Sequence, residues 1–133
     1  MTTLVIAFIV ATQTYHLPKG LLNSLCFVES AHNIHAVHKD DGNGDSLGVC
    51  QVKLNTARML GFTGTQKELM SAKTNIKYAA KYLSKQLDRY DGDSTKAIAA
   101  YNSGTFKRDQ YDRIVNRQYV LKVYRQWYKD SRK

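Results

Sequence analysis

The sequence lacks the many cysteines of a disulfide-rich protein, the cysteine spacing of a metal site and the long apolar runs of a membrane-spanning protein. Two cysteines among 133 residues are too few for a disulfide scaffold, and their separation is not that of metal ligands. The longest apolar run, LVIAFIVA at residues 4–11, is far too short to cross a bilayer. There are no internal repeats, low-complexity tracts or linker-like stretches. These absences favour one globular domain, for which we expect no stable membrane insertion.

Acidic residues are scarce relative to basic ones. Twenty Lys and Arg stand against eleven Asp and Glu, which gives a formal net charge of +9 at pH 7. This imbalance predicts an anionic partner, namely nucleic acid, an anionic membrane or a cell-wall polymer rich in carboxylate and phosphate. The alternative is a solvated basic surface that only aids solubility. The apolar fraction of 43% is ordinary for a folded protein.

Two features each allow two interpretations. Residues 4–11 are either the apolar region of a signal peptide or a first helix buried against the domain. We therefore separate a hydrophobic N-terminal segment, residues 1–14, from a domain at residues 15–133. Cys26 and Cys50 either form one bridge or remain small buried apolar groups. We expect two free thiols, because both lie in stretches with the apolar pattern of a core.

The apolar spacing predicts a protein built almost wholly of helices. The strongest pattern covers residues 74–92, where apolar side chains advance by four, three, four and three residues and Gly92 ends the helix. Further helices are expected from Pro18 to residue 30, over 54–61, after a Thr65–Glu68 capping box, after an N-cap at Ser94, and over about 110–129. Residues 31–48 have the composition of a loop. No useful stretch alternates as a strand does, so the predicted fold class is all-α.

Glu29 is an acid in an apolar position. It follows Leu22 by seven residues, Leu25 by four and Cys26 by three, so it projects from the apolar stripe of its predicted helix. Burial disfavours the charged form of a carboxyl group and raises its pKa. A raised pKa lets a general acid hold its proton near neutral pH. The alternative is an ion pair with Lys or Arg, or a simple helix end.

The loop after Glu29 contains groups that bind metals in other proteins. Asp41, Asn43 and Asp45 occupy the first three ligand positions of a calcium loop, but the required Gly and the final Glu are missing. Three histidines recur every third residue, namely His32, His35 and His38. In a loop they need not share a face, as a zinc site would require. We expect no metal and no cofactor.

Three short motifs occur in a distinctive order. They are the pair Glu29-Ser30, SLGVCQV at residues 46–52 and AAYNSG at residues 99–104. Together they resemble the motifs of the soluble lytic transglycosylase and goose-type lysozyme superfamily. The resemblance extends over about residues 15–128. It implies the α-helical lysozyme-like fold, and as substrate the β-1,4 bond between N-acetylmuramic acid and N-acetylglucosamine in peptidoglycan.

The first two motifs imply roles for four residues. By the resemblance, Glu29 would be the catalytic acid and base, and Ser30 would orient the substrate near that carboxyl group. Gly48 and Gln51 would lie in the turn beside the cleft. Cys50 replaces the usual Met, which we expect to disturb little.

The remaining matches imply a sugar-binding corner. Tyr101 and Asn102 would bind the sugar next to the scissile bond, and Tyr119 would line the wall of the cleft. Asp40 matches an acid of the goose-type pattern, and Lys53 stands where that pattern has another. Asp40 is therefore a candidate second carboxylate.

The number of carboxylates separates two reactions. A glycosidase that hydrolyses usually needs two. In the transglycosylases that this chain resembles, one acid protonates the leaving oxygen and then takes a proton from the substrate's 6-hydroxyl group, which closes a 1,6-anhydro ring. We favour the transglycosylase, with a goose-type-like hydrolase that uses Asp40 as the alternative.

There are alternatives from two other functional classes. A non-catalytic peptidoglycan-binding module would have lost its acid first, and Glu29 is present. A nucleic-acid-binding domain would suit the charge, but it has no use for an acid on an apolar face, so we expect no nucleic acid partner. We expect a monomer that acts on peptidoglycan strands in the periplasm or at the cell wall, either exported or phage-encoded and delivered there.

Overall fold

The computed structural model describes residues 2–40, 42 and 44–133. The helices are α1 (Thr3–Thr14), α2 (Leu21–Ser30), α3 (Leu54–Met59), α4 (Gln66–Met70), α5 (Ala72–Arg89), α6 (Ser94–Ser103) and α7 (Arg117–Ser131). The strands β1 (Val37–His38), β2 (Ser46–Leu47) and β3 (Val52–Lys53) pair antiparallel in that order. The structure is mostly helical, which confirms the predicted class.

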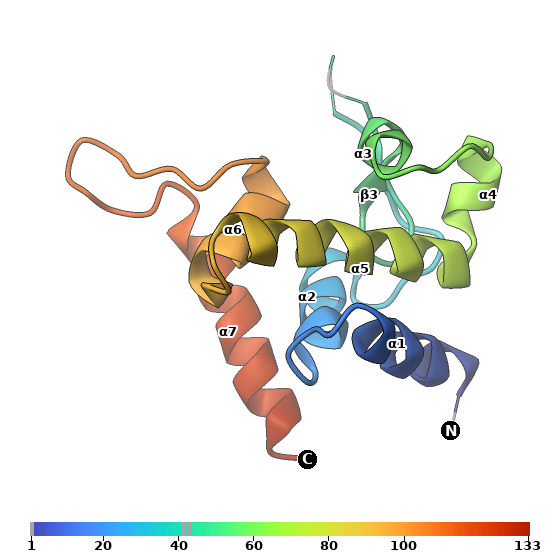
Figure 1. Cartoon of the computed structure of the whole chain (residues 1–133), viewed down its shortest axis with the longest axis horizontal. Helices are drawn as coiled ribbons and strands as arrows, with labels where there is room; N and C mark the ends of the chain where they lie inside the picture. Colours follow the sequence, from blue (N-terminus) through green and yellow to red (C-terminus); the bar gives the residue numbers. More distant parts are fainter. Residues whose placement is uncertain (1, 41, 43) are drawn as a thin grey trace.

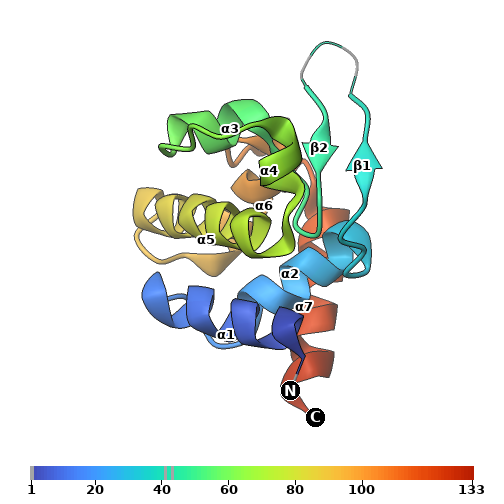
Figure 2. The same ribbon diagram turned by 90° about the vertical axis from the view of Figure 1, so that its right-hand side faces the viewer.

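Helix α5 lies across the middle of the molecule (Figure 1). Its apolar stripe, which includes Ile76, Ala80 and Leu83, is buried in the core. It packs against α1, α2, α4 and α6. In the turned view α3 lies on one side of α5 and α1 on the other (Figure 2). The central helix therefore contacts elements on both of its sides.

Several predicted helix boundaries are confirmed. Gly92, two residues after the α5 C-cap Tyr90, has φ +83°, and its N–H donates 2.7 Å to the carbonyl oxygen of Leu87. Thr65 and Glu68 form the reciprocal capping box at the start of α4. At α6 the cap is Asp93 and not Ser94, since the Asp93 side chain accepts from the Lys96 N–H.

Three predictions about local structure were wrong. The second helix begins at Leu21 and not at Pro18, because Gly20 takes a left-handed conformation with φ +79°. The last helix begins at Arg117, since residues 104–116 form a long loop (Figure 1) closed by a bridge between Arg108 and Ile114. The segment at residues 31–48 contains β1 and β2, whose two-residue length is too short for alternation to show in a sequence.

The expectation of two free thiols was also wrong. Cys26 and Cys50 form a disulfide with a Cα–Cα distance of 4.4 Å. Both residues are fully buried, as their apolar neighbours indicated. The sequence pattern placed each in the core but did not reveal that α2 brings one against the other.

The N-terminal apolar run forms most of α1. Phe8 and Ala11 are buried, whereas Ile6 and Val10 stay about half exposed, at 47% and 55%. Helix α1 ends at Thr14 and packs against α5. No helix in the part of the chain that the structure describes is long and apolar enough to cross a membrane.

Candidate active site

Glu29 stands in the last turn of α2 and faces a cleft. The hydroxyl group of Tyr119, in the first turn of α7, donates a hydrogen bond of 2.6 Å to Glu29 Oε2. Burial raises the pKa of Glu29 to about 7, and the hydrogen bond from Tyr119 opposes this shift in part. Among the described residues Glu29 belongs to no ion pair. The carboxyl group can therefore both hold and release a proton near neutral pH.

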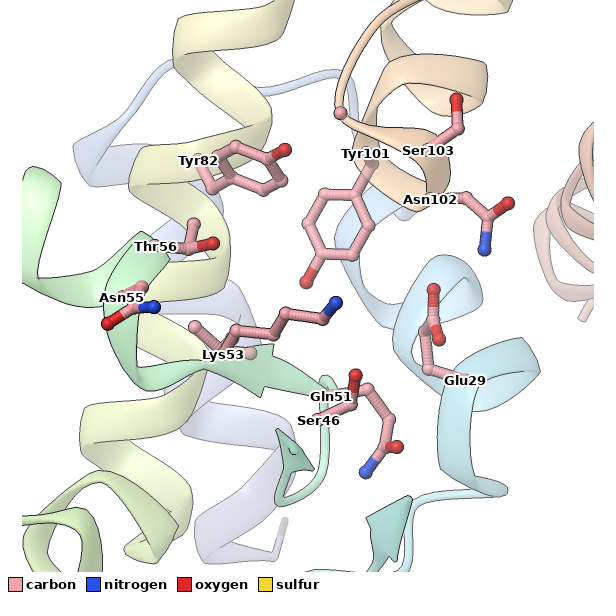
Figure 3. Close-up of a pocket in the computed structure, with 12 residues that line it drawn as sticks. Glu29, Ser46, Gln51, Lys53, Asn55, Thr56, Tyr82, Tyr101, Asn102 and Ser103 are labelled. Atoms are coloured by element: carbon pink, nitrogen blue, oxygen red, sulfur yellow. The ribbon is translucent and has the colours of Figure 1, made fainter. Parts of the chain in front are cut away.

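The cleft has a volume of about 490 Å³. Its lining comes from α2, β2 and β3 with the turn between them, α3, α5 and the end of α6 (Figure 3). The lining residues are Glu29, Ser46, Gln51, Val52, Lys53, Asn55, Thr56, Tyr82, Tyr101, Asn102, Ser103 and Gly104. Of the predicted site residues, the structure thus brings Glu29, Gln51, Tyr101 and Asn102 together.

Tyr101 joins two walls of the cleft. It lies near the end of α6, and its hydroxyl group donates 2.8 Å to the carbonyl oxygen of Cys50. Its ring packs at 5.2 Å from the ring of Tyr82 on α5. Burial first, and then the charge of Glu29, raises the pKa of Tyr101 well above the usual value of a tyrosine. The hydroxyl group therefore stays protonated and continues to donate to the turn.

Asn102 presents its amide to the cleft. Its Oδ1 accepts 2.9 Å from Asn116 Nδ2, which also donates 2.9 Å to the carbonyl oxygen of Ala99. With the oxygen oriented in this way, the amide nitrogen points toward Glu29 (Figure 3). The side chain is exposed, so a sugar in the cleft can accept a hydrogen bond from this nitrogen.

The turn before β3 is held by a buried amide. Gly48 has φ +77°, and a Cβ there would lie 2.6 Å from Asn75 Nδ2 on α5, so only glycine fits. Asn75 Oδ1 accepts 2.8 Å from the Cys50 N–H, and its Nδ2 donates to the carbonyl oxygens of Leu47 and Leu69. Asn75 was missed in the sequence, although it lies on the apolar face of α5 as Glu29 does on that of α2.

Ser30 and Gln51 complete the support of this turn. The Ser30 hydroxyl group donates 2.6 Å to the carbonyl oxygen of Val49 and does not line the cleft. Gln51 has φ +55°, and its Nε2 donates to the carbonyl oxygens of Gly48 and Ala36. Ser30 and Gly48 therefore support the turn without lining the cleft, whereas Gln51 lines it.

Asp40 does not line the cleft. Its Oδ2 accepts 3.2 Å from Lys53 Nζ, and the pair forms a salt bridge. Lys53 does line the cleft. Asp40 and Lys53, the two positions that the goose-type pattern identifies, thus contact each other, and the Asp40 carboxylate is paired with the Lys53 ammonium group.

No three His, Cys, Asp or Glu side chains within residues 2–40, 42 and 44–133 are placed to hold a metal ion. His32 packs between the rings of Phe8 and Phe27. Of the calcium pattern, Asp41 and Asn43 lie outside the described residues, and Asp45 pairs with Lys39 at 3.8 Å.

Comparison with known proteins gives a consistent result. Residues 6–120 match the family described as "Transglycosylase SLT domain". Protein IpgF of Shigella flexneri and of Shigella sonnei are each 27% identical over 119 residues, which is 88% of this chain and 76% of each relative.

A solved structure shares the fold. An inactive mutant of the lytic transglycosylase Slt from Pseudomonas aeruginosa matches 92% of this chain with a TM-score of 0.74 and 20% identity. The chain spans 23% of the length of that protein. At this identity the likeness shows the lysozyme-like SLT fold.

Proposed function

Because the chain belongs to the transglycosylase SLT domain family, we propose that it is a lytic transglycosylase. It cleaves the β-1,4 bond between N-acetylmuramic acid and N-acetylglucosamine in peptidoglycan and leaves 1,6-anhydro ends. The observation that carries this proposal is Glu29, a carboxyl group with a pKa raised to about 7 at the surface of a cleft. A single group that ionises near neutral pH suits a reaction in which it acts first as acid and then as base.

The reaction needs one proton to move twice. Glu29 gives its proton to the glycosidic oxygen as the bond from that oxygen to C1 breaks, and the acetamido group of the substrate stabilises the cationic centre. The Glu29 carboxylate then takes the proton of the 6-hydroxyl group, whose oxygen bonds to C1. Glu29 ends protonated, and no water is consumed.

Neighbouring residues orient the Glu29 carboxyl group and the sugar. Tyr119 donates to Oε2 of Glu29, which leaves Oε1 for the substrate. Asn102 donates its amide N–H to the sugar, and the Tyr101 ring forms the wall beside it. Because the Tyr101 hydroxyl group donates a hydrogen bond to the carbonyl oxygen of Cys50, the contribution of Tyr101 to binding comes from its ring.

Hydrolysis with Asp40 as the second carboxylate is disfavoured by geometry. A water-activating base must reach a water on the face of the sugar opposite the acid. Asp40 pairs with Lys53 and is absent from the cleft lining. We therefore retain the single-carboxylate mechanism.

The products distinguish the transglycosylase reaction from hydrolysis. Purified peptidoglycan is digested and the muropeptides are weighed: anhydro products, lighter by one water, are expected, whereas reducing ends would contradict the proposal. Glu29→Gln should abolish product formation. Glu68→Gln is the matched control, because Glu68 lies on α4 in a capping box that glutamine also satisfies. If Glu29→Gln cleaves as fast as the parent, the site assignment is wrong; if both proteins only bind the strands, the chain is a binding module.

We place the enzyme in the periplasm or at the cell wall, as a monomer on glycan strands. The Cys26–Cys50 disulfide supports this placement, because such bonds persist in oxidising compartments. The excess of basic residues suits a wall polymer that carries carboxylates and phosphates.

A further inference from the structure

Lys53 is the cation of the cleft. Of the described residues that line the cleft, only Glu29 and Lys53 carry charged groups. Lys53 is the last residue of β3, directly before α3. Its side chain extends from β3 toward the part of the cleft that holds Tyr101 and Glu29 (Figure 3). The resemblance to known families gave this lysine no role.

The ion pair with Asp40 does not use all the N–H donors of the Lys53 ammonium group. Lys53 Nζ donates 3.2 Å to Asp40 Oδ2, and a lysine ammonium has three N–H donors. The two side chains are 33% and 42% exposed, so their mutual attraction is weakened by solvent. Asp40 therefore positions the ammonium group at the cleft and leaves it able to bind a second anion.

Resting on the proposed function, we infer that Lys53 is a specificity-determining residue that binds a carboxylate on the muramyl substituent of the substrate. An N-acetylated glycan backbone is uncharged, whereas the peptide stem on the muramyl lactyl group carries carboxylates. When the stem is removed, the lactyl group itself becomes a carboxylate. Lys53 thus favours strands that carry one of these anions over strands that carry none.

Three substrates separate the sources of the anion. Soluble glycan strands with intact stems carry stem carboxylates, strands stripped by an amidase carry only lactyl carboxylates, and intact strands whose carboxylates are chemically amidated carry neither. Formation of anhydro products is followed to obtain KM and kcat. For the wild-type protein we expect KM on the amidated strands to exceed KM on intact strands by about 3- to 10-fold, the range of one partly exposed charge-assisted hydrogen bond.

Substitutions assign the preference to Lys53. Lys53→Gln should bring the ratio of the two KM values close to one, and Lys53→Arg should restore most of it. Lys39→Gln is the control, because it removes an equal charge. Lys39 lies in the loop between β1 and β2 and does not line the cleft. If stripped strands behave as intact ones do, Lys53 accepts the lactyl carboxylate as well as those of the stem; if they behave as amidated ones do, Lys53 binds the stem carboxylates alone.

A purely structural ion pair gives a different result. In that case Asp40→Asn and Lys53→Gln would raise KM equally on all substrates and lower the thermal midpoint alike, which would overturn the inference. We expect instead that Asp40→Asn keeps the preference for carboxylate-bearing strands. An unchanged KM ratio in Lys53→Gln, with anhydro products still formed, overturns only the role of Lys53. Absence of anhydro products from the wild-type protein overturns the proposed function itself.

Discussion

At the scale of single residues, the site depends on two opposing effects on one carboxyl group. Burial raises the pKa of Glu29, and the hydrogen bond from Tyr119 holds it down, with a result of about 7. The acid must be protonated before it meets the substrate and ionised after the first step. A value near neutrality lets one group fulfil both conditions.

The pH dependence of kcat/KM tests this balance. For the wild-type protein we expect kcat/KM to fall above about pH 7, because Glu29 loses its proton there. Tyr119→Phe removes a hydrogen bond that favours the carboxylate, so the alkaline limb should move to higher pH by about one unit. Tyr124→Phe is the matched control, since that hydroxyl group, also on α7, contacts Thr95 at 2.8 Å. A limb that stays in place in Tyr119→Phe would contradict the role given to Tyr119.

At the scale of elements, one turn connects the two sides of the cleft. The segment from Gly48 to Gln51 is bonded to α2 through Ser30, to α5 through Asn75 and to α6 through Tyr101. The Cys26–Cys50 disulfide adds a covalent connection one helical turn from Glu29. The relative position of the acid and the sugar-binding corner therefore depends on this turn.

The disulfide should stabilise the fold and the site together. It closes a loop with a sequence separation of 24 residues, for which chain entropy predicts about 3 kcal/mol. The double variant Cys26→Ala/Cys50→Ala should lower the free energy of unfolding by about this amount and lower kcat as well. Urea unfolding with and without reductant measures the effect, and reductant should leave the double variant unaffected. Equal stability of variant and parent would show that the connection is dispensable.

The helices could be predicted from the sequence because their signals are local. The apolar spacing of α5, its terminal Gly92 and the capping box at Thr65 each lie within a few residues of the feature that they define. Glu29 could be found in the same way, as a polar group at an apolar position. The resemblance of the motifs then assigned Glu29 and Tyr101, which are far apart in the sequence, to the same site.

Contacts between distant segments could not be predicted. The disulfide, the hydrogen bonds of Asn75 and the ion pair between Asp40 and Lys53 depend on how α2, α5 and the hairpin pack. Ser30 and Tyr101 were assigned to substrate by resemblance, yet their hydroxyl groups contact carbonyl oxygens of the turn. A sequence motif identifies such residues without showing which of their atoms remain available.

At the scale of the whole molecule, the buried acid lowers the stability of the fold at the pH where it ionises. The pKa of Glu29 rises from 4.5 to about 7 on folding. Between these values the folded protein binds a proton that the unfolded chain has lost, so the free energy of unfolding falls as pH rises. Above about pH 7 both states are ionised, and the loss reaches its full value of up to about 3 kcal/mol.

The variant Glu29→Gln should therefore be more stable than the wild-type protein at pH 8 and about equal to it at pH 4.5. The glutamine keeps the shape of the side chain and an oxygen that accepts from Tyr119, but it carries no charge to bury. Urea unfolding at the two pH values measures the difference, which should grow by up to about 3 kcal/mol. Glu68→Gln gives the opposite sign, because hydrogen bonds from Thr65 lower the pKa of Glu68, so that its carboxylate is favoured by folding. A stability difference for Glu29→Gln that does not change with pH would mean that folding leaves the pKa of Glu29 unperturbed, and the single-acid mechanism would lose its physical basis.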